Sequence, residues 1–588
     1  MHFGKSITIR TLPILFCVVA IIVAGCGSQP QGSGTGNKRT KAPASQQVYR
    51  YGDVVGTDIS SFDPGQATDG PSIEAISLVF TGLVELDDNL QVQPQLAKSY
   101  QVSNDGLTYT FTLRPNLKFS DGTPLTSHDV AYSLDRALSP QISSLNGVTL
   151  TYLGLLKDAA QRANGKIPTL INDSIITPDD TTVVLKVSKK TAYFLQALTY
   201  STSYVVEKKV IDQWGLKWVD HLGDNGGQGG DGPFKVVSYS HTTGIDFVPN
   251  PNYYGPIPQL QKVQYIFFKT PDTAYAAYET NQVDFVKAFP PADLDKARQL
   301  KQEYHQNPEL IIDYLTMNYL YKPFDNIHIR QAFELAINKD IISQSLYKGI
   351  RVPTCHVVPS GMPGYNPNLK CPGGASTSGN ANLAKQLFQQ GLQEEGLTLA
   401  TLPPIKLTYE SDAPTLANEI TTIRQMWQTT LGVTVQTDVI DFVPLLTAET
   451  NTLCTNPDFH ACLNKGLQMW TGAWGADYPD PQDWTTLQFD KYAPNNDWNY
   501  GQNGSSDAAQ QQQIQQQLEQ ADVTSDAATR LQMYNQAEQQ LVNDVAWLPM
   551  DQRFGAQLLK PYEVGETFNA LGLMPPPNDW GNIYVAAH

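Results

Sequence analysis

The sequence predicts an α/β protein of more than one domain. The chain has 588 residues, too many for a single hydrophobic core, so two or three domains are expected. Residues 414–431 have the pattern of a helix that ends at Gly432, and the alternating run 433–439 that follows has the pattern of a strand. Residues 108–113 also alternate polar and apolar side chains, as a half-buried strand does. A helix followed directly by a strand is typical of α/β units with open sheets.

The first part of the folded body predicts strands and one well-marked helix. Residues 48–120 are rich in strand patterns. Thr126 and Asp129 form a capping-box pattern in front of a helix with one apolar face. Residues 181–187 have the pattern of a further strand.

Later segments continue the mixture of helices and strands. A strand is expected at 263–268, and helices are expected near 272–279, 327–337 and 382–392. Residues 508–543 are rich in glutamine but keep an apolar stripe, so packed helices are favoured over a low-complexity segment.

A glycine-rich loop covers residues 223–232. It lacks the spacing of a phosphate-binding loop, and it does not fit the calcium-binding loop pattern either. We therefore interpret it as a flexible crossing between domains.

The N-terminus has the pattern of an export signal. Lys5 and Arg10 give it a positive start, and residues 11–24 form an apolar run that ends before Cys26. The run is shorter than the roughly 20 residues of a membrane-spanning helix. Residues 1–25 are therefore predicted to be a signal peptide.

Cys26 is the predicted lipidation site. Residues 23–26 resemble the bacterial lipobox, whose cysteine becomes the lipidated first residue of the mature protein. The alternative is an ordinary signal peptide with an incidental cysteine. Residues 26–47 contain few apolar side chains and are predicted to be a flexible tether. The chain is thus expected at the extracytoplasmic face of the cell membrane, held there by its lipid.

The charge of the chain argues against nucleic acid as a partner. The formal net charge is −17 at pH 7, whereas binding to nucleic acid requires clustered lysine and arginine.

Beyond Cys26, the mature chain contains four cysteines. An oxidising compartment and their short separations predict the disulfides Cys355–Cys371 and Cys454–Cys462. The alternative is a four-cysteine zinc site, but the spacing lacks any Cys-x-x-Cys and fits poorly. No metal and no cofactor are predicted.

A series of motifs lies in order along most of the mature chain: Ser61–Pro64, Val79–Val84, Leu96–Tyr100, Lys118–Val130, Gly232–Phe234, Asn250–Tyr254, Pro323–Phe333 and Trp474–Pro481. This series resembles the large solute-binding proteins of bacterial oligopeptide and dipeptide importers, extracellular solute-binding protein family 5.

The resemblance implies an α/β fold of the type II periplasmic-binding-protein kind, in which two hinged lobes close on a ligand beside an extra structural domain. The domains that it implies are lobe I at 48–86 with 231–316 and 548–588, the extra domain at 87–230, and lobe III at 317–547.

The resemblance also implies a function. The chain would be a lipid-anchored, monomeric substrate-binding protein of an ABC importer, which captures peptides and delivers them to a membrane permease without changing them. It would not be an enzyme.

Asp477 is the first candidate for ligand contact. In peptide-binding relatives the acid at this place pairs with the α-ammonium group of the ligand, and a desolvated carboxylate suits that role. The alternative is a turn residue, because aspartate is common in turns. Asp480 precedes Pro481 and is interpreted as an N-cap instead.

Aromatic and backbone contacts complete the candidate site. Trp474, Trp470 and Tyr478 are candidate walls of the cleft, although the two tryptophans could equally lie on one face of a buried strand. Thr68 and Gly70 lie in the segment that offers backbone hydrogen bonds to the peptide in relatives. No residue is assigned to the ligand's C-terminus.

Other functions remain open at this point. A surface hydrolase is one, but the sequence contains neither HExxH nor GxSxG. A non-peptide ligand of the same fold, such as a metal chelate, haem, an oligosaccharide or an opine, is another. A receptor without transport would share the same sequence features.

Overall fold

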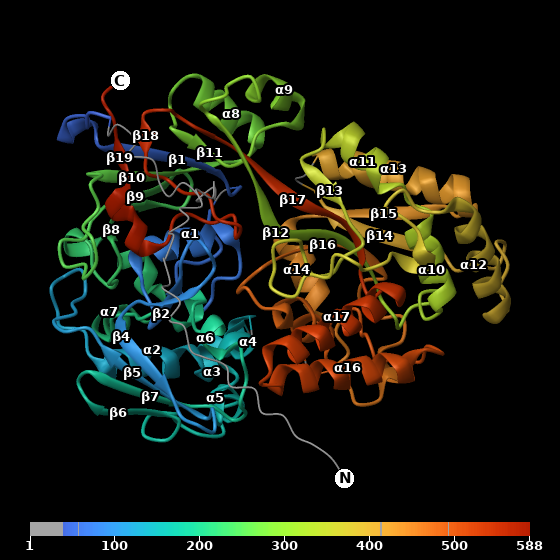
Figure 1. The fold of residues 1–588 in the computed structure, drawn as a ribbon, viewed down its shortest axis with the longest axis horizontal. Helices are drawn as coiled ribbons and strands as arrows, with labels where there is room; N and C mark the ends of the chain where they lie inside the picture. The colour runs from blue at the N-terminus through green and yellow to red at the C-terminus, as the bar shows by residue number, and fades with distance from the viewer. Residues whose placement is uncertain (1–38, 57, 147, 412–413, 492) are drawn as a thin grey trace, which may run out of the picture. The chain divides into compact units, whose positions relative to one another are not determined.

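The computed structural model describes residues 39–588 apart from 57, 147, 412–413 and 492 (Figure 1). Residues 41–588 form one compact unit. The predicted signal peptide and Cys26 lie outside the described residues. Within the described part of the chain, no helix is both long enough and apolar enough to cross a membrane.

In the described residues, an 11-stranded mixed sheet runs through the compact unit. Its strands are β1 (Val48–Val54), β8 (Phe234–Ser240), β9 (Gly244–Pro249), β10 (Lys262–Phe268), β11 (Phe285–Val286), β12 (Tyr304–Met317), β13 (Arg351–Pro353), β14 (Ile405–Glu410), β15 (Val435–Ile440), β16 (Met469–Gly475) and β17 (Leu548–Leu559). Their order is β15-β14-β16-β12-β17-β11-β1-β10-β9-β8, and β13 pairs with β17.

Strands β12 and β17 join the two ends of this sheet (Figure 1). At one end β1 is parallel to β10 and β11, and at the other β14 is parallel to β15 and β16. Between them β12 and β17 are antiparallel, and their register shifts between Pro308 and Ile312 and again between Asp313 and Tyr314. Such irregularities bend a ladder locally. The two ends are thus connected through two long strands that are irregular near their middle.

The end of the sheet with β1 packs on helix α1 (Gly70–Val79). Its core contains Tyr49, Tyr265 and Phe247 from the strands and Ile76 from α1. The neighbouring elements are α7 (Lys208–Trp214), η3 (Gly215–His221), η4 (Asp224–Gly226), α8 (Pro271–Glu279), η5 (Pro291–Asp293), α9 (Leu294–Ala297), β18 (Glu563–Val564), η9 (Pro577–Asn582) and β19 (Tyr584–Val585).

A second, four-stranded sheet has the order β4-β5-β7-β6. Its strands and helices, with the β2–β3 hairpin beside it, are β2 (Val84–Leu86), β3 (Val92–Pro94), β4 (Ala97–Val102), β5 (Thr108–Leu113), α2 (Ser127–Ala137), α3 (Pro140–Asn146), α4 (Val148–Leu153), α5 (Ala159–Ala163), β6 (Ile175–Asp179), β7 (Thr182–Lys186), α6 (Phe194–Ala197) and η2 (Ser201–Ser203). The hydrophobic core of this region, called the small-sheet core below, takes side chains from Leu83 to Val205 and also Tyr478.

The other end of the long sheet has two cores. One surrounds β14 and contains Trp427, and the other surrounds β16 and contains Trp470 and Trp547. The elements are α10 (Ile327–Leu335), α11 (Lys339–Leu346), η6 (Pro372–Gly374), α12 (Ala381–Glu394), α13 (Pro414–Leu431), α14 (Phe442–Thr450), η7 (Phe459–Cys462), η8 (Pro481–Trp484), α15 (Thr486–Phe489), α16 (Ala508–Val523) and α17 (Ala527–Asn543). The domain boundaries expected from the sequence stay a prediction.

Local sequence patterns predicted many of these elements well. The capping box of α2 is present, with the backbone N–H of Thr126 donating to Asp129 Oδ2 over 2.8 Å. Helix α13 has the predicted bounds, and Gly432 after it has a φ of 76°. The glutamine-rich stretch 508–543 forms two helices, and Asp526 caps the second of them.

The predicted tether 26–47 is too long at its C-terminal end. Ala42 donates its backbone N–H to the carbonyl oxygen of Val585 over 2.9 Å. The side-chain amide of Gln47 donates to the carbonyl oxygens of Ala42 and Val585, and Gln47 is 1% exposed. A polar side chain with buried partners can pack where composition alone indicates flexibility. Any flexible tether therefore ends before Lys41.

The glycine-rich loop 223–232 is not the flexible crossing expected from the sequence. Residues 227–232 are buried, and Gly232 donates its N–H to the carbonyl oxygen of Val79 over 2.7 Å. A Cβ on Gly230 would lie 2.2 Å from that same oxygen. The glycines allow two backbones to approach closely, which a local pattern cannot distinguish from freedom to move.

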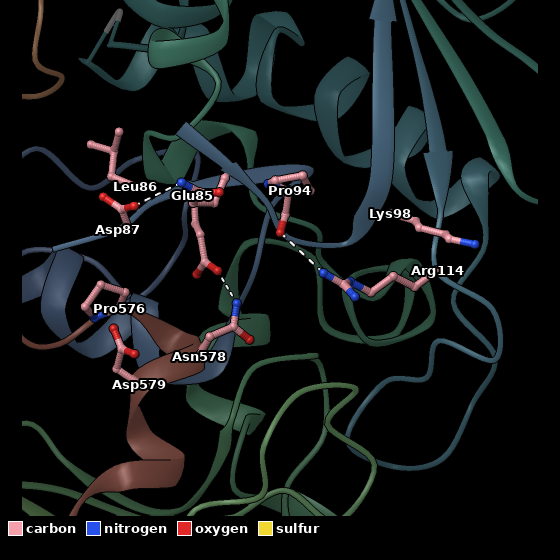
Figure 2. Close-up of a pocket in the computed structure, with 10 residues that line it drawn as sticks. Glu85, Leu86, Asp87, Pro94, Lys98, Arg114, Pro576, Asn578 and Asp579 are labelled. Carbon is pink, nitrogen blue, oxygen red and sulfur yellow. Dashed lines mark hydrogen bonds between the residues drawn. The ribbon is translucent and has the colours of Figure 1, made fainter. Parts of the chain in front are cut away.

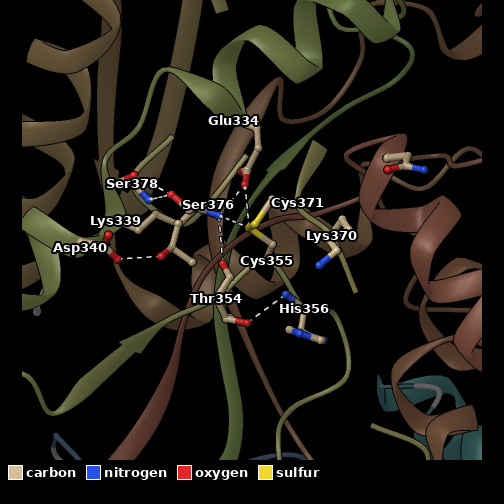
Figure 3. The surroundings of a disulfide bond; sticks show 12 residues. Glu334, Lys339, Asp340, Thr354, Cys355, His356, Lys370, Cys371, Ser376 and Ser378 are labelled. Carbon is tan, nitrogen blue, oxygen red and sulfur yellow. Dashed lines mark hydrogen bonds and ion pairs between the residues drawn. A yellow bond between two sulfur atoms is a disulfide. The ribbon is translucent and has the colours of Figure 1, made fainter. Parts of the chain in front are cut away.

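Both expected disulfides are present in the structure, Cys355–Cys371 and Cys454–Cys462. Figure 3 shows the first of them, beside the buried ion pair of Lys339 with Glu334. Lys339 Nζ lies 2.5 Å from Glu334 Oε1 and donates to the carbonyl oxygen of Thr354 over 3.0 Å. The disulfide Cys355–Cys371 thus holds the 355–371 loop beside the buried ion pair of Lys339 with Glu334.

We expect Cys355→Ser with Cys371→Ser to lower the free energy of unfolding by about 3 kcal/mol, because the bond closes a loop with a sequence separation of 16. Urea unfolding followed by tryptophan fluorescence measures the change. The matched control is the pair Cys454→Ser and Cys462→Ser, whose separation of 8 predicts a smaller loss of about 2.5 kcal/mol. An equal or larger loss in this control would contradict the loop-length argument.

Candidate ligand-binding site

Asp477 lies in the turn that leaves β16 and enters η8. The turn is fixed by Asp480, whose side chain accepts from the N–H of Gln482 over 3.0 Å and so caps η8, as predicted. Asp480 also accepts two hydrogen bonds from Arg530 of α17, over 2.8 and 2.6 Å. Both partners of this ion pair are buried. The cap and the ion pair of Asp480 hold the turn in one conformation, and this conformation fixes the position of Asp477.

The carboxylate of Asp477 contacts a distant part of the chain. The hydroxyl of Tyr152, on α4 of the four-stranded-sheet region, donates a hydrogen bond to Asp477 Oδ2. The backbone N–H of Asp477 donates to Asp483 Oδ2 over 3.1 Å. Among the described residues, neither Asp477 nor Asp483 has a cationic side chain in contact. The site therefore contains two carboxyl groups that can become negatively charged, and no described side chain in contact with them carries a positive charge to balance them.

Burial shifts the titration of both acids. It raises the pKa of Asp477 to about 7, while the hydrogen bond from Tyr152 lowers it. Burial and then the charge of Asp477 raise the pKa of Asp483 well above its usual range. A cation placed beside Asp477 would favour its ionised form.

Aromatic rings surround the Asp477 turn. Tyr152 stacks on Tyr200 with ring centroids 3.7 Å apart, and Tyr193 lies parallel to Tyr478 at 6.1 Å. Tyr478 is 1% exposed and belongs to the small-sheet core, although it follows β16 in the chain. The turn thus packs against the four-stranded-sheet region.

The two tryptophans of β16 differ in burial. Trp470 is 1% exposed within the core around β16, which favours the buried-strand interpretation over a cleft wall. Trp474 pairs across the ladder with Ile312 and is only partly buried at the edge of that core. Trp474 remains a candidate wall.

The segment with Thr68 and Gly70 lies at the start of α1. Gly70 is the first residue of α1, Asp69 caps that helix, and Thr68 is exposed. The carboxylates of Asp477 and Asp69 both raise the pKa of Tyr200, after burial, so both lie within electrostatic range of one hydroxyl. Thr68 and Gly70, on either side of Asp69, stay predicted backbone contacts to the ligand.

Sequence reasoning missed the partners of Asp477. Asp483 follows it by six residues, two beyond the end of the Trp474–Pro481 motif, so its proximity was a signal available from the sequence. Tyr152 is 325 residues away, and Arg530 is 50 residues from Asp480. No local pattern points to either of them.

A separate cavity of about 390 Å³ lies between the β2–β3 hairpin and residues 576–579 (Figure 2). Glu85 accepts hydrogen bonds there from Asn578 and, over 3.0 Å, from Gln95. Burial raises the pKa of Glu85 to about 8. None of the predicted ligand contacts lines this cavity. In the residues the structure describes, no three His, Cys, Asp or Glu side chains are placed to hold a metal ion.

The chain is similar to known proteins over most of its length. The oligopeptide-binding protein OppA of Bacillus subtilis (strain 168) is 25% identical over 557 residues, 93% of this chain and 94% of that protein. The probable deoxycholate-binding periplasmic protein YgiS of Escherichia coli (strain K12) is 26% identical over 560 residues, 93% of this chain and 95% of that protein. In structure, the murein tripeptide binding protein MppA of Escherichia coli superposes with a TM-score of 0.75 at 22% identity, over 92% of this chain and 99% of that one.

The structural likeness establishes the fold predicted from the sequence, the two-lobed α/β fold of type II periplasmic binding proteins. The family model described as "Bacterial extracellular solute-binding proteins, family 5 Middle" matches residues 91–496. This chain is therefore a member of the bacterial extracellular solute-binding proteins of family 5.

Proposed function

We propose that the chain is the substrate-binding protein of an ABC importer, which captures di- and oligopeptides through their N-terminal ammonium group at Asp477 and delivers them unchanged to a permease. The observation that carries this proposal is the carboxylate of Asp477, which has a hydroxyl partner but no cation among the described residues. The name of the OppA relative, an oligopeptide-binding protein, supports the same ligand class.

The chemistry of the turn suits an ammonium group. An ammonium has three donors, and a carboxylate in a partly desolvated site forms short, directional hydrogen bonds with it. Trp474 would supply apolar contact beside the charged group, which accepts many side chains because it makes few geometric demands. Thr68 and Gly70 would offer backbone groups to the extended peptide.

The proposal includes the place of the protein in the cell. Residues 1–25 would be removed on export, and Cys26 would carry the lipid that holds a monomeric chain at the extracytoplasmic face of the membrane. The family name, which describes extracellular proteins, supports this location.

The test compares two forms of one peptide. The mature chain, residues 26–588 with Cys26→Ser so that it stays free of lipid, is titrated with tetra-alanine and with N-acetyl-tetra-alanine by calorimetry. Acetylation removes the ammonium charge, so we expect its Kd to be about 100-fold higher, since losing one partner of a desolvated charge pair costs about 3 kcal/mol.

Three results would contradict the proposal. Equal affinity for both peptides would mean that the ammonium is not what the site recognises. Shorter peptides in the mass spectrum after incubation would indicate a hydrolase. Native mass spectrometry of protein taken from its host, showing only a bile acid or another non-peptide solute, would favour a non-peptide ligand, for which the name of the YgiS relative provides the precedent.

A further inference from the structure

Two carboxylic acids, not one, form the centre of the proposed ligand site. Asp483 is 0% exposed and accepts the backbone N–H of Asp477 at Oδ2 over 3.1 Å. Asp483 Oδ1 is buried without a hydrogen bond of ordinary geometry. Trp474 is near enough to lower the pKa of Asp483, but its indole N–H also lacks a well-formed bond.

Within the described part of the chain, the groups that face this pair supply no positive charge. Tyr152 of α4 and Tyr200, just before η2, face it with neutral hydroxyls. Asp480, in the same turn, is a third acid. Arg530 of α17 is bonded to Asp480 through both terminal nitrogens and so neutralises that acid.

Asp483 is fully buried and Asp477 is partly buried, and two acids that close together do not readily both ionise without a cation. When the site is empty, the acids must therefore keep protons over part of the neutral pH range. A ligand ammonium beside Asp477 would supply the missing charge, and a proton would then have to leave.

We propose that ligand capture at this site exchanges a proton for a cation: the ammonium group of the ligand displaces one proton from Asp477 to solvent, Asp483 stays protonated, and Tyr152 is the positioning residue that sets the pH at which the exchange occurs. The proposal rests on the function proposed above. Charge balances, because one cation enters the site as one proton leaves it.

The role of Tyr152 follows from its hydrogen bond. Its hydroxyl donates to the Asp477 carboxylate, and a donor favours the ionised form of an acid. This bond lowers the pKa of Asp477, whereas burial raises it. Tyr152 and Asp477 lie on different parts of the fold, α4 and the turn after β16, so the bond forms only while those parts are in contact.

The sign of the pH dependence is fixed by this exchange. The bound state holds fewer protons than the empty state below the pKa of Asp477, about 7, so affinity falls as the pH falls. Between pH 7.5 and pH 5.5 we expect the Kd of tetra-alanine to rise roughly 20-fold. The peptide's own amino group, with a pKa of about 7.7–8.0, is mostly protonated at pH 7.5 and gains protons as the pH falls, so its titration opposes this rise by less than about twofold.

Calorimetry in buffers of different ionisation enthalpy counts the protons. We expect release of about one proton per peptide at pH 6 and a small fraction of one at pH 7.5. Tyr152→Phe removes the hydrogen bond and should raise the midpoint by about one pH unit, so that its Kd exceeds that of wild type by roughly tenfold at pH 6.5. The control is Tyr109→Phe, a buried tyrosine of the small-sheet core, which should leave the midpoint unchanged.

Three other results would each contradict one part of the proposal: the exchange, the role of Tyr152 or the proposed function. Peptide binding without proton release at any pH would overturn the exchange while leaving the proposed function intact. A loss of affinity in Tyr152→Phe that is the same at every pH would reduce Tyr152 to a structural contact and overturn its assigned role. Absence of peptide binding at all pH values would overturn the proposed function, and the exchange with it.

Discussion

Asp477→Asn is expected to raise the Kd of a free-amino peptide by about 100-fold at pH 7.5. Asparagine keeps the size of the side chain but cannot carry the charge that an ammonium needs in a desolvated place. The ammonium of the bound peptide would then be buried without a counter-charge, a loss of about 3 kcal/mol. Titration calorimetry with tetra-alanine measures it directly.

The matched control for Asp477→Asn changes the same charge elsewhere. Asp212→Asn alters an acid that is 58% exposed in a surface pair with Lys208, and it should leave the Kd within twofold. The N-acetylated peptide should bind Asp477→Asn and wild type equally, because the lost interaction is already absent. If Asp477→Asn weakened both peptides alike, the residue would act on the shape of the cleft and not on the ammonium.

Arg530→Met is expected to be the most destabilising single change near the site. Arg530 and Asp480 are 5% and 4% exposed, and the substitution leaves the Asp480 carboxylate buried without its partner. Breaking one side of such a pair costs about 3–5 kcal/mol. Urea unfolding should show the loss, and the Asp477 turn should bind peptide more weakly because Asp480 anchors it.

Two further variants separate the effect of the lost charge from the effect of the lost packing of Arg530. Arg530→Met combined with Asp480→Asn should recover part of the lost stability, because asparagine can still cap η8 without leaving a buried charge. Lys208→Met, at the exposed pair with Asp212, should change the free energy of unfolding by less than about 0.5 kcal/mol. No recovery in the double variant would mean that packing of the arginine stem dominates.

Local chemistry allowed prediction wherever the determinants lie close in the sequence. The bounds of α13, the glycine after it and the capping box of α2 each depend on residues within one helical turn. The cap at Asp480 was predictable for the same reason, since Pro481 follows it directly. Asp477 itself came from a family resemblance and not from periodicity.

Long-range contacts account for what the sequence could not show. The pairing of Tyr152 with Asp477 depends on how α4 and the turn after β16 pack, and neither segment carries a mark of the other. The glycine-rich loop was misinterpreted because glycine permits both motion and close backbone contact. The domain boundaries stay a prediction, and β12 and β17 join the two ends of one sheet across the boundary that the sequence predicts.

The hydrogen bond from the N–H of Ala42 to the carbonyl oxygen of Val585 joins the beginning of the compact unit to its end. Lys41 and Ala586 form an isolated bridge beside it, so the first and last residues of the unit share one edge. A compact unit whose two ends meet in this way can have them joined and be opened elsewhere with its strand order intact. Conversely, trimming the last few residues would remove the acceptor of Ala42 and Gln47 together and loosen both termini at once.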